Sequence, residues 1–324
     1  MRPLSYSRVD SVEDAVALGR EPGTAFLAGG TTEIDLVRAG VERPDLLVDI
    51  NDLPFADVED LADGGLRIGA LARMNDVAWA PAVAERYPAI SQALLLGASE
   101  QLRNMASMGG NLRQRTRCAY LRDGISPCNK REPGSGCAAL EGFNRGHAIL
   151  GTSEHCIALH PSDVAIALVA FDAVVHTTEQ SIPFDDFFLL PGDTPQLEHP
   201  LAQGELITAI EVPGVPIARN SIYLKFRDRQ SYEFALVSVA VALAVEDGVV
   251  ADVRLALGAV GTKPWWARRA EAELVGGPAD RAAFRRAAAA ELEAAVVREH
   301  TAFKVELAQR TIVRILHDVS GVQS

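Results

Sequence analysis

Alternating hydrophobic and polar positions predict a small β-α-β unit over about the first 55 residues. Ser11 to Asp14 resembles a capping box ahead of the helical segment AVALGR. TAFLAG predicts a strand, and the glycine pair after it predicts a tight turn. TEIDLVRAG predicts a short helix that ends near Gly40, and PDLLVDI predicts the next strand.

The next part of the chain, to about residue 216, predicts further strands and helices around an irregular loop. Gly64-Gly65 marks a turn before the strand LRIGAL, and the chain from Trp79 to Arg103 is mostly helical in pattern. SDVAIALVAFDAVVHT predicts a helix and then a strand, and ELITAIEV predicts a strand within a Pro-rich section. Residues 112–158 are rich in Gly, Pro, Arg and Asn and have no steady period. We expect something other than a hydrophobic core to stabilise this loop.

From about residue 217 the composition changes. SIYLKFR, FALVSVAVALAVED and VADVRLALGAVG predict three strands, and Asp247-Gly248 between the last two is a hairpin signal. ADRAAFRRAAAAELEAAVVREH and AFKVELAQRTIVRILHDV predict helices. The pattern indicates an α+β class and two domains, 1–216 (with subdomains of about 1–55 and 56–216) and 217–324.

Composition narrows the class of protein. The 324 residues are 48% hydrophobic and 23% charged, which is ordinary for a soluble globular protein. The net charge of −12 argues against a general nucleic-acid binder, because phosphate neutralisation needs surplus Lys and Arg. The longest apolar run, Phe234 to Val245, is shorter than the roughly 20 residues that span a bilayer. The N-terminus carries neither a signal-peptide pattern nor a twin-arginine motif, so we expect no membrane association. The compartment stays open between the cytoplasm and export with a twin-arginine-bearing partner.

Three turns built from small and polar residues lie in the first half of the chain. They are Gly29 to Thr32, Ser107 to Asn111, and His160 to Asp163. Each could be an ordinary turn, and the pattern G-x-G-x-x-G of a Rossmann dinucleotide site is missing. Together they favour an extended phosphate-bearing ligand, because backbone N–H groups at such turns donate hydrogen bonds to anions.

All four cysteines fall between residues 118 and 156, with the spacing C-x9-C-x8-C-x18-C. The C-x-x-C pattern of zinc knuckles and the ferredoxin run are both missing, so spacing does not select the metal. Basic side chains surround the first two cysteines, and such charges offset the burial of an anionic cluster. They are Arg113, Arg115, Arg117, Arg122, Lys130 and Arg131. These observations favour an iron–sulfur cluster, with zinc, disulfides and free thiols as alternatives.

Several stretches resemble a known family. GGTTEIDL, SMGGNL, the loop RCAYLRDGISPCNKREPGSGCAALEGFNRGHAILGTSEHCIALHPSD and YLKFRDRQSYEFALVSVA are similar to the flavin subunit of bacterial molybdenum hydroxylases of the xanthine dehydrogenase family. The likeness is greatest to the FAD-binding subunit of heterotrimeric aldehyde oxidoreductases and covers essentially the whole chain. It implies a two-subdomain FAD-binding domain of the vanillyl-alcohol-oxidase/PCMH type, followed by a carbon monoxide dehydrogenase flavoprotein-like C-terminal α+β domain.

The resemblance also implies two cofactor sites, one for FAD and one for a 4Fe-4S cluster, and no catalytic side chain. The cluster ligands would be Cys118, Cys128, Cys137 and Cys156. The FAD contacts would be Phe26, Leu27, Ala28, Gly29, Gly30, Thr31, Thr32, Glu33, Ile34, Ser107, Gly110, Asn111, Gln114, Ser162, Asp163, Lys225 and Tyr232.

The implied role is electron transfer within a heterotrimer. A large subunit with the molybdenum cofactor would oxidise an aldehyde, and a small subunit with 2Fe-2S clusters would pass the electrons to FAD here and on to an external acceptor. The aldehyde range, the acceptor, dimerisation of the heterotrimer and the place of the 4Fe-4S cluster in the electron path stay open. A self-contained FAD oxidase and a zinc-stabilised interaction subunit are the alternatives.

Overall fold

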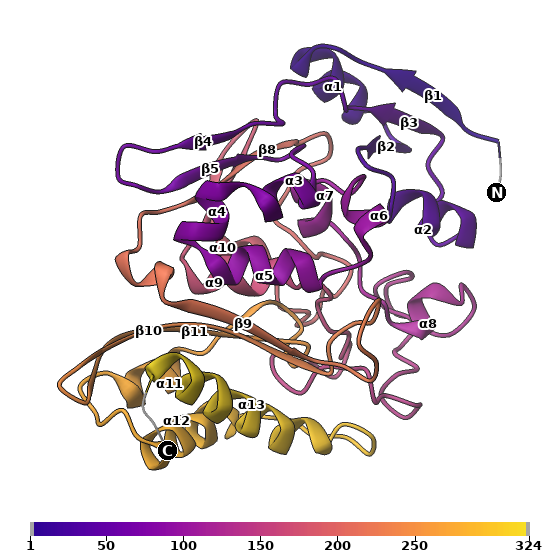
Figure 1. The fold of residues 1–324 in the computed structure, drawn as a ribbon. Helices are drawn as coiled ribbons and strands as arrows, with labels where there is room; N and C mark the ends of the chain where they lie inside the picture. The colour runs from indigo at the N-terminus through magenta and orange to yellow at the C-terminus, as the bar shows by residue number, and fades with distance from the viewer. Residues whose placement is uncertain (1–2, 322–324) are drawn as a thin grey trace.

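The computed structural model describes residues 3–321 as three tiers, each built around one sheet (Figure 1). A three-stranded sheet has the order β1-β3-β2, a five-stranded sheet the order β4-β5-β8-β6-β7, and a four-stranded sheet the order β12-β11-β10-β9. The predicted α+β class is confirmed. The domain boundaries, including the one near residue 216, stay predictions.

The first tier is a small parallel sheet with helices beside it. Ser11 Oγ accepts a hydrogen bond from the backbone N–H of Asp14, as the predicted capping box requires, and Gly40 ends the second helix with φ of 73°. The elements are β1 (Ser5–Arg8), α1 (Val12–Gly19), β2 (Thr24–Leu27), α2 (Glu33–Ala39) and β3 (Leu46–Asp49).

The middle tier packs helices against an antiparallel sheet. Its strands are β4 (Val58–Asp60), β5 (Leu66–Gly69), β6 (Val174–Thr177), β7 (Ser181–Pro183) and β8 (Ile207–Val212). Its helices are α3 (Met74–Trp79), α4 (Pro81–Arg86), α5 (Pro88–Leu96), α6 (Glu100–Arg103), α7 (Met108–Leu112), α9 (Val164–Ala170) and α10 (Phe184–Phe187). Every residue of α9 is buried, which accounts for its uninterrupted apolar sequence.

The third tier shows why its central strand is hydrophobic on both faces. Along β10, Val239 and Val241 pack into the core formed with the C-terminal helices, while Ala240 and Ala242 pack into the core of the middle tier. The alanines allow the sheet to approach α5 and α9 closely. The elements are β9 (Ser221–Phe226), β10 (Val237–Glu246), β11 (Val249–Gly258), β12 (Trp265–Trp266), α11 (Arg268–Leu274), α12 (Arg281–Leu292), α13 (Phe303–Ser320) and the 3-10 turn η1 (Pro216–Arg219).

Asp247 and Gly248 form the predicted hairpin turn, with φ of 48° and 80°. The prediction of helices on one face is incomplete, because helices of the middle tier cover the opposite face of this sheet. The long helix expected from residue 279 onward ends at Leu292. Several short elements were not predicted, among them β1, β4, α3, α7, β7, α10, β12 and α11. Within residues 3–321 we find no helix that has both the length and the apolarity to cross a membrane.

The cysteine segment, residues 112–158, is irregular, as expected. Its one short helix is α8 (Ala119–Arg122), and the rest is turns and loops between the middle and third tiers (Figure 1). Side-chain hydrogen bonds support it. Arg131 Nη1 donates to the carbonyls of Tyr120 and Leu121, and Asn129 Oδ1 accepts from the backbone N–H groups of Gly134 and Gly136.

Candidate functional site

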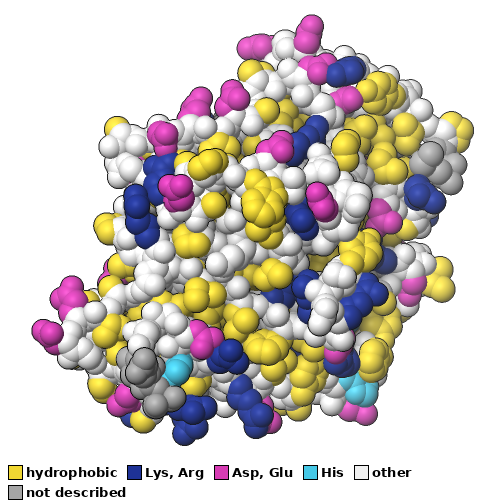
Figure 2. Space-filling view, viewed as in Figure 1, with side chains coloured by type: hydrophobic (Ala, Val, Ile, Leu, Met, Phe, Trp, Pro, Cys, Tyr) yellow, Lys and Arg dark blue, Asp and Glu magenta, His cyan; other side chains and the backbone are white. Residues whose placement is uncertain are grey.

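A cavity of about 700 Å³ lies where segments from all three tiers meet. The turn after β2, the turn before α7, residues 201–207 and the loop after β9 all contribute to its walls. Its volume falls within the range of sites that enclose a cofactor-sized molecule. Figure 2 shows one face of the molecule, with basic, acidic and hydrophobic side chains interspersed over it.

The first wall is the turn between β2 and α2. A Cβ on Gly29 would lie 1.9 Å from the backbone oxygen of Met105, so the two loops approach more closely than a side chain allows. Gly30 has φ of 71°, a conformation that favours glycine. The turn therefore exposes backbone to the cavity, which suits the close approach of a diphosphate.

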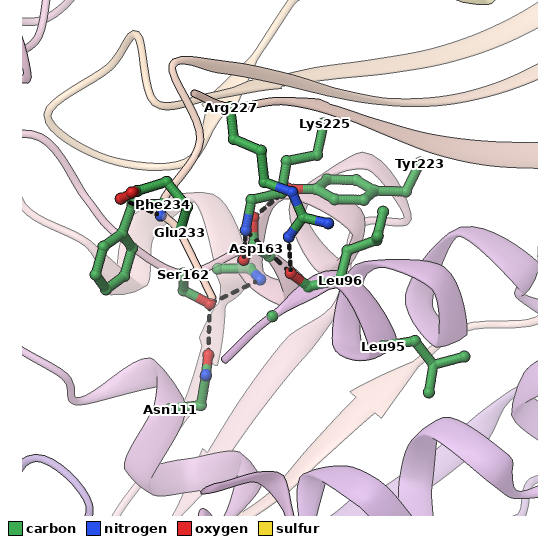
Figure 3. Close-up of polar contacts among 12 residues, drawn as sticks. Leu95, Leu96, Asn111, Ser162, Asp163, Tyr223, Lys225, Arg227, Glu233 and Phe234 are labelled. Carbon is green, nitrogen blue, oxygen red and sulfur yellow. Dashed lines mark hydrogen bonds and ion pairs between the residues drawn. The ribbon is translucent and has the colours of Figure 1, made fainter. Parts of the chain in front are cut away.

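The second wall is the turn that begins α7. Ser107 Oγ accepts a hydrogen bond from the backbone N–H of Gly110 at 3.2 Å, which fixes the start of the helix. The backbone N–H of Gly109 donates to the oxygen of Ala70 at 2.7 Å and ties the turn to the end of β5. Asn111 then accepts a hydrogen bond from Ser162 Oγ (Figure 3).

The third wall contains a buried ion pair between Asp163, at the start of α9, and Lys225 of β9. Lys225 Nζ lies 2.8 Å from Asp163 Oδ2 and also donates to the oxygen of Leu96 at 3.1 Å. Tyr223 donates its hydroxyl to Asp163 Oδ1 at 2.6 Å (Figure 3). Burial raises the pKa of Asp163, and the charge of Lys225 opposes that shift. The ion pair and the tyrosine hydroxyl therefore fix the position of Asp163 at this wall.

Arginines that follow α7 add positive charge to the cavity. Arg115 contacts the carboxylates of Glu42 and Glu198, and Glu198 also binds Lys130. Burial opposes ionisation of Glu198, but Lys130 and Arg115 hold its pKa at about 2. Within residues 3–321, Arg113 lines the cavity with no carboxylate oxygen within 4.0 Å of its guanidinium.

Glu33 is a cavity carboxylate whose ionisation is strongly perturbed. Burial raises its pKa to about 7, and the nearby charge of Glu42 acts in the same direction. Its Oε1 atom is buried with no hydrogen-bond partner in the described part of the chain. Near neutral pH this side chain is therefore close to half neutral.

Most of the predicted FAD contacts line this cavity, and three do not. These three are Leu27 and Ile34, whose side chains lie near Gly30, and Ser162, which donates its hydroxyl to Asn111. No sequence pattern pointed to Arg229, Phe234 or residues 201–207 as part of the site, although all of them line it. Only the apolar and basic character of the loop RDRQSYEF could have indicated the first two.

The four cysteines, distant in sequence, line one small space next to this cavity. All four are free thiols, so the disulfide alternative is not what the structure shows. Burial raises the pKa of Cys118 and of Cys156 to about 11. Within residues 3–321, no three His, Cys, Asp or Glu side chains converge closely enough to hold a single metal ion.

One stretch of chain separates the two sites. Gln114, Arg115 and Arg117 line the large cavity, whereas Thr116 and Cys118 line the thiol space. From Arg115 to Cys118, successive residues line opposite sides, as expected for extended chain. The two sites therefore share a wall one backbone thick.

Comparisons with known proteins identify the family. The family described as "FAD binding domain in molybdopterin dehydrogenase" matches residues 2–215, and the "CO dehydrogenase flavoprotein C-terminal domain" matches residues 222–319. This chain belongs to the FAD-binding subunits of molybdopterin-dependent dehydrogenases. It is an FAD-binding oxidoreductase subunit, and the predicted resemblance is confirmed.

Individual relatives agree with this assignment. The chain is 48% identical over 322 residues to the aldehyde oxidoreductase FAD-binding subunit PaoB of Escherichia coli (strain K12), covering 98% of both chains. It is 27% identical to the glyceraldehyde dehydrogenase medium chain of Sulfolobus acidocaldarius, over 84% of this chain and 81% of the relative. Carbon monoxide dehydrogenase from Hydrogenophaga pseudoflava shares the fold, with a TM-score of 0.75, 23% identity and 99% coverage of both chains.

Proposed function

We propose that this chain is the FAD- and 4Fe-4S-binding electron-transfer subunit of an aldehyde-oxidising molybdenum hydroxylase. Its partners would be a molybdenum large subunit and a 2Fe-2S small subunit, and an external acceptor would take the electrons. The 48% identity to a subunit named for aldehyde oxidoreductase supports the substrate class. The observation that carries the cluster is the meeting of four distant thiols around one space.

The residues present fit FAD. Gly29 lets the turn after β2 pack directly against the backbone of Met105, which leaves the backbone of that turn at the cavity, and the cavity offers cationic side chains to a diphosphate. Bound FAD supplies the redox chemistry, since it can hold one or two electrons. The chain contributes shape and charge: Ser107 and Asn111 order one loop, and Asp163 with Lys225 joins the walls. Tyr232 and Gln114 close further parts of the cavity.

The donor set also fits a 4Fe-4S cluster better than zinc. Four thiolates suit either group, but a tetrahedral zinc ion needs all four sulfur atoms around one point. These thiols surround a space, without three of them within reach of a single ion in the described residues. His147 Nε2 lies 3.2 Å from Cys118 Sγ, so a ring N–H can donate to that ligand.

Metal and flavin analysis of the chain expressed with its partner subunits tests both assignments. We expect FAD, about four iron atoms per copy of this chain beyond those of the small subunit, and no zinc. A Cys128→Ser variant should lose that iron and keep FAD. Zinc in place of iron would establish the interaction-subunit alternative. Oxidation of an aldehyde or alcohol by this chain without partners would establish the oxidase alternative.

A second measurement addresses the electron path. In the assembled complex, the rate at which aldehyde reduces the flavin is compared between wild type and the Cys128→Ser variant. An unchanged rate without the cluster would exclude an obligatory relay. Loss of reduction with FAD retained would place the cluster on the path.

A further inference from the structure

Residues 227–236, the loop between β9 and β10, cover part of the large cavity. Arg229, Tyr232 and Phe234 line it from this loop. Tyr232 and Phe234 remain 57% and 42% exposed, and Tyr232 has a positive φ of 51°. An aromatic pair left this open has little packing of its own to hold it over the cavity.

Several of the loop's contacts are internal. Arg229 Nε donates to the backbone oxygen of Tyr232 at 3.1 Å and lies 3.3 Å from the carboxylate of Glu233. The backbone N–H of Leu236 donates to the oxygen of Phe226 at 2.8 Å, which closes the base of the loop. These bonds set the shape of the loop but not its position relative to the cavity.

The cysteine segment supplies one external support through a forked ion pair. Arg145 Nη1 lies 2.7 Å from Asp228 Oδ2, and Arg145 Nη2 lies 3.0 Å from Asp228 Oδ1. The guanidinium carbon of Arg145 also lies 5.1 Å from the ring centroid of Phe303, at the start of α13. Arg145 therefore contacts both the loop and the start of α13. A bidentate arginine–carboxylate pair also adds geometric specificity.

A second support comes from the other end of the same segment. The guanidinium carbon of Arg117 lies 5.3 Å from the ring centroid of Phe234. Arg117 also reaches Thr32 Oγ1 at 3.4 Å and Asp35 at 3.5 Å, both at the start of α2. It therefore links the first tier, the cysteine segment and the loop at the rim of the cavity.

Both supports connect directly to the thiol space. Arg117 directly precedes Cys118 in the chain. Arg145 lies two residues before His147, whose ring contacts Cys118 Sγ. We propose that Arg145 and Arg117 are positioning residues through which the cysteine segment holds residues 227–236 over the flavin cavity. A filled thiolate site then keeps the flavin cavity covered, and an emptied one opens it to solvent and to small electron acceptors. This second statement rests on the proposed 4Fe-4S site.

The test measures loop mobility and flavin loss in the assembled complex. Hydrogen–deuterium exchange of peptides covering 227–236 and the rate of FAD release are recorded for Arg145→Gln, Asp228→Asn and the exchanged pair Arg145→Asp/Asp228→Arg. We expect each single change to speed both rates by about two- to fivefold, the range of an exposed ion pair. The exchanged pair should return both rates towards wild type.

A matched control removes another exposed arginine pair. Arg314 Nε lies 2.7 Å from Asp318 on α13, away from the cavity, so Arg314→Gln should change neither rate. Equal rates in wild type, Arg145→Gln and Asp228→Asn would overturn the proposal. So would single variants whose faster rates the exchanged pair fails to correct.

The Cys128→Ser variant tests the link to the cluster. We expect it to accelerate exchange of 227–236 as Arg145→Gln does, with no change in exchange across β10. If wild type holds iron and this variant leaves the exchange of 227–236 unchanged, the link is wrong. If wild type holds no iron, the cluster assignment itself fails, and the arginine variants still decide the positioning role.

Discussion

Lys225 Nζ lies 2.8 Å from Asp163 Oδ2, and this ion pair joins the third tier to the middle tier at the cavity wall (Figure 3). The side chains are only 1% and 10% exposed. A charge buried to this degree requires its partner, because removing one member leaves the other without compensation. The contact between the two tiers and the shape of the flavin cavity therefore both depend on this pair.

Replacing Lys225 by Met should lower the free energy of unfolding by about 3–5 kcal/mol, because Asp163 then stays buried without a counter-charge. The double variant Lys225→Met/Asp163→Asn should recover part of that loss. Urea unfolding, followed by the ellipticity of the helices, measures both variants, and the absorbance of retained FAD reports the cavity. A double variant less stable than Lys225→Met would contradict this account of the pair.

Adding one methyl group at Gly29 should weaken flavin binding without removing any functional group. The new Cβ would lie 1.9 Å from the backbone oxygen of Met105, and backbone cannot rotate away as a side chain can. We expect Gly29→Ala to weaken FAD binding at least about tenfold and to destabilise the fold by about 1–3 kcal/mol. Gly146→Ala is the control, since no atom lies within 4 Å of its Cβ position. Normal FAD content in Gly29→Ala would show that the two loops can separate freely.

The fold was predictable where a local pattern carries the information. The alternation of Val and Ala along β10 reads directly as a strand buried on both faces, and Asp247-Gly248 reads as its hairpin. The two-residue strand β12 and the helix α11 were missed because their positions depend on contacts with β11 and α12 that no local pattern records. The third tier shows both cases within one sheet.

The site residues also divide into those that a local sequence pattern predicted and those that it did not. Gly29-Gly30 and Ser107 were found from sequence because a tight turn needs particular residues at particular positions. Arg229 and Phe234 were missed because they enter the cavity from a loop whose contacts, with Arg117 and Arg145 among others, come from distant parts of the chain. The cysteine spacings are too long for any local geometry, so only the folded chain brings the thiols together.

Glu33 should make FAD binding depend on pH near neutrality. Its pKa is raised to about 7, so the carboxyl is mostly neutral at pH 6 and mostly charged at pH 8. A negative charge in the cavity opposes the FAD diphosphate, so affinity should fall as pH rises, by about three- to tenfold. Fluorescence titration of the flavin-depleted protein at the two pH values measures this change. Glu33→Gln should bind equally at both, and a pH dependence that survives in it would assign the effect elsewhere.

His147 should raise the reduction potential of the proposed cluster. Burial lowers the pKa of His147 to about 4, so its ring is neutral, and Nδ1 is buried without a partner in the described chain. A ring proton on Nε2, 3.2 Å from Cys118 Sγ, would donate to that ligand and stabilise the extra negative charge of the reduced state. We expect His147→Leu to lower the midpoint potential, followed by electron paramagnetic resonance, on the order of tens of millivolts. His147→Gln, which keeps a donor, should lower it less.

His155→Leu is the matched control, because His155 lines the same space but pairs with Asp193 and makes no hydrogen bond to sulfur among the described residues. Equal shifts in the two leucine variants would mean that the potential responds to polarity around the thiols and not to this hydrogen bond.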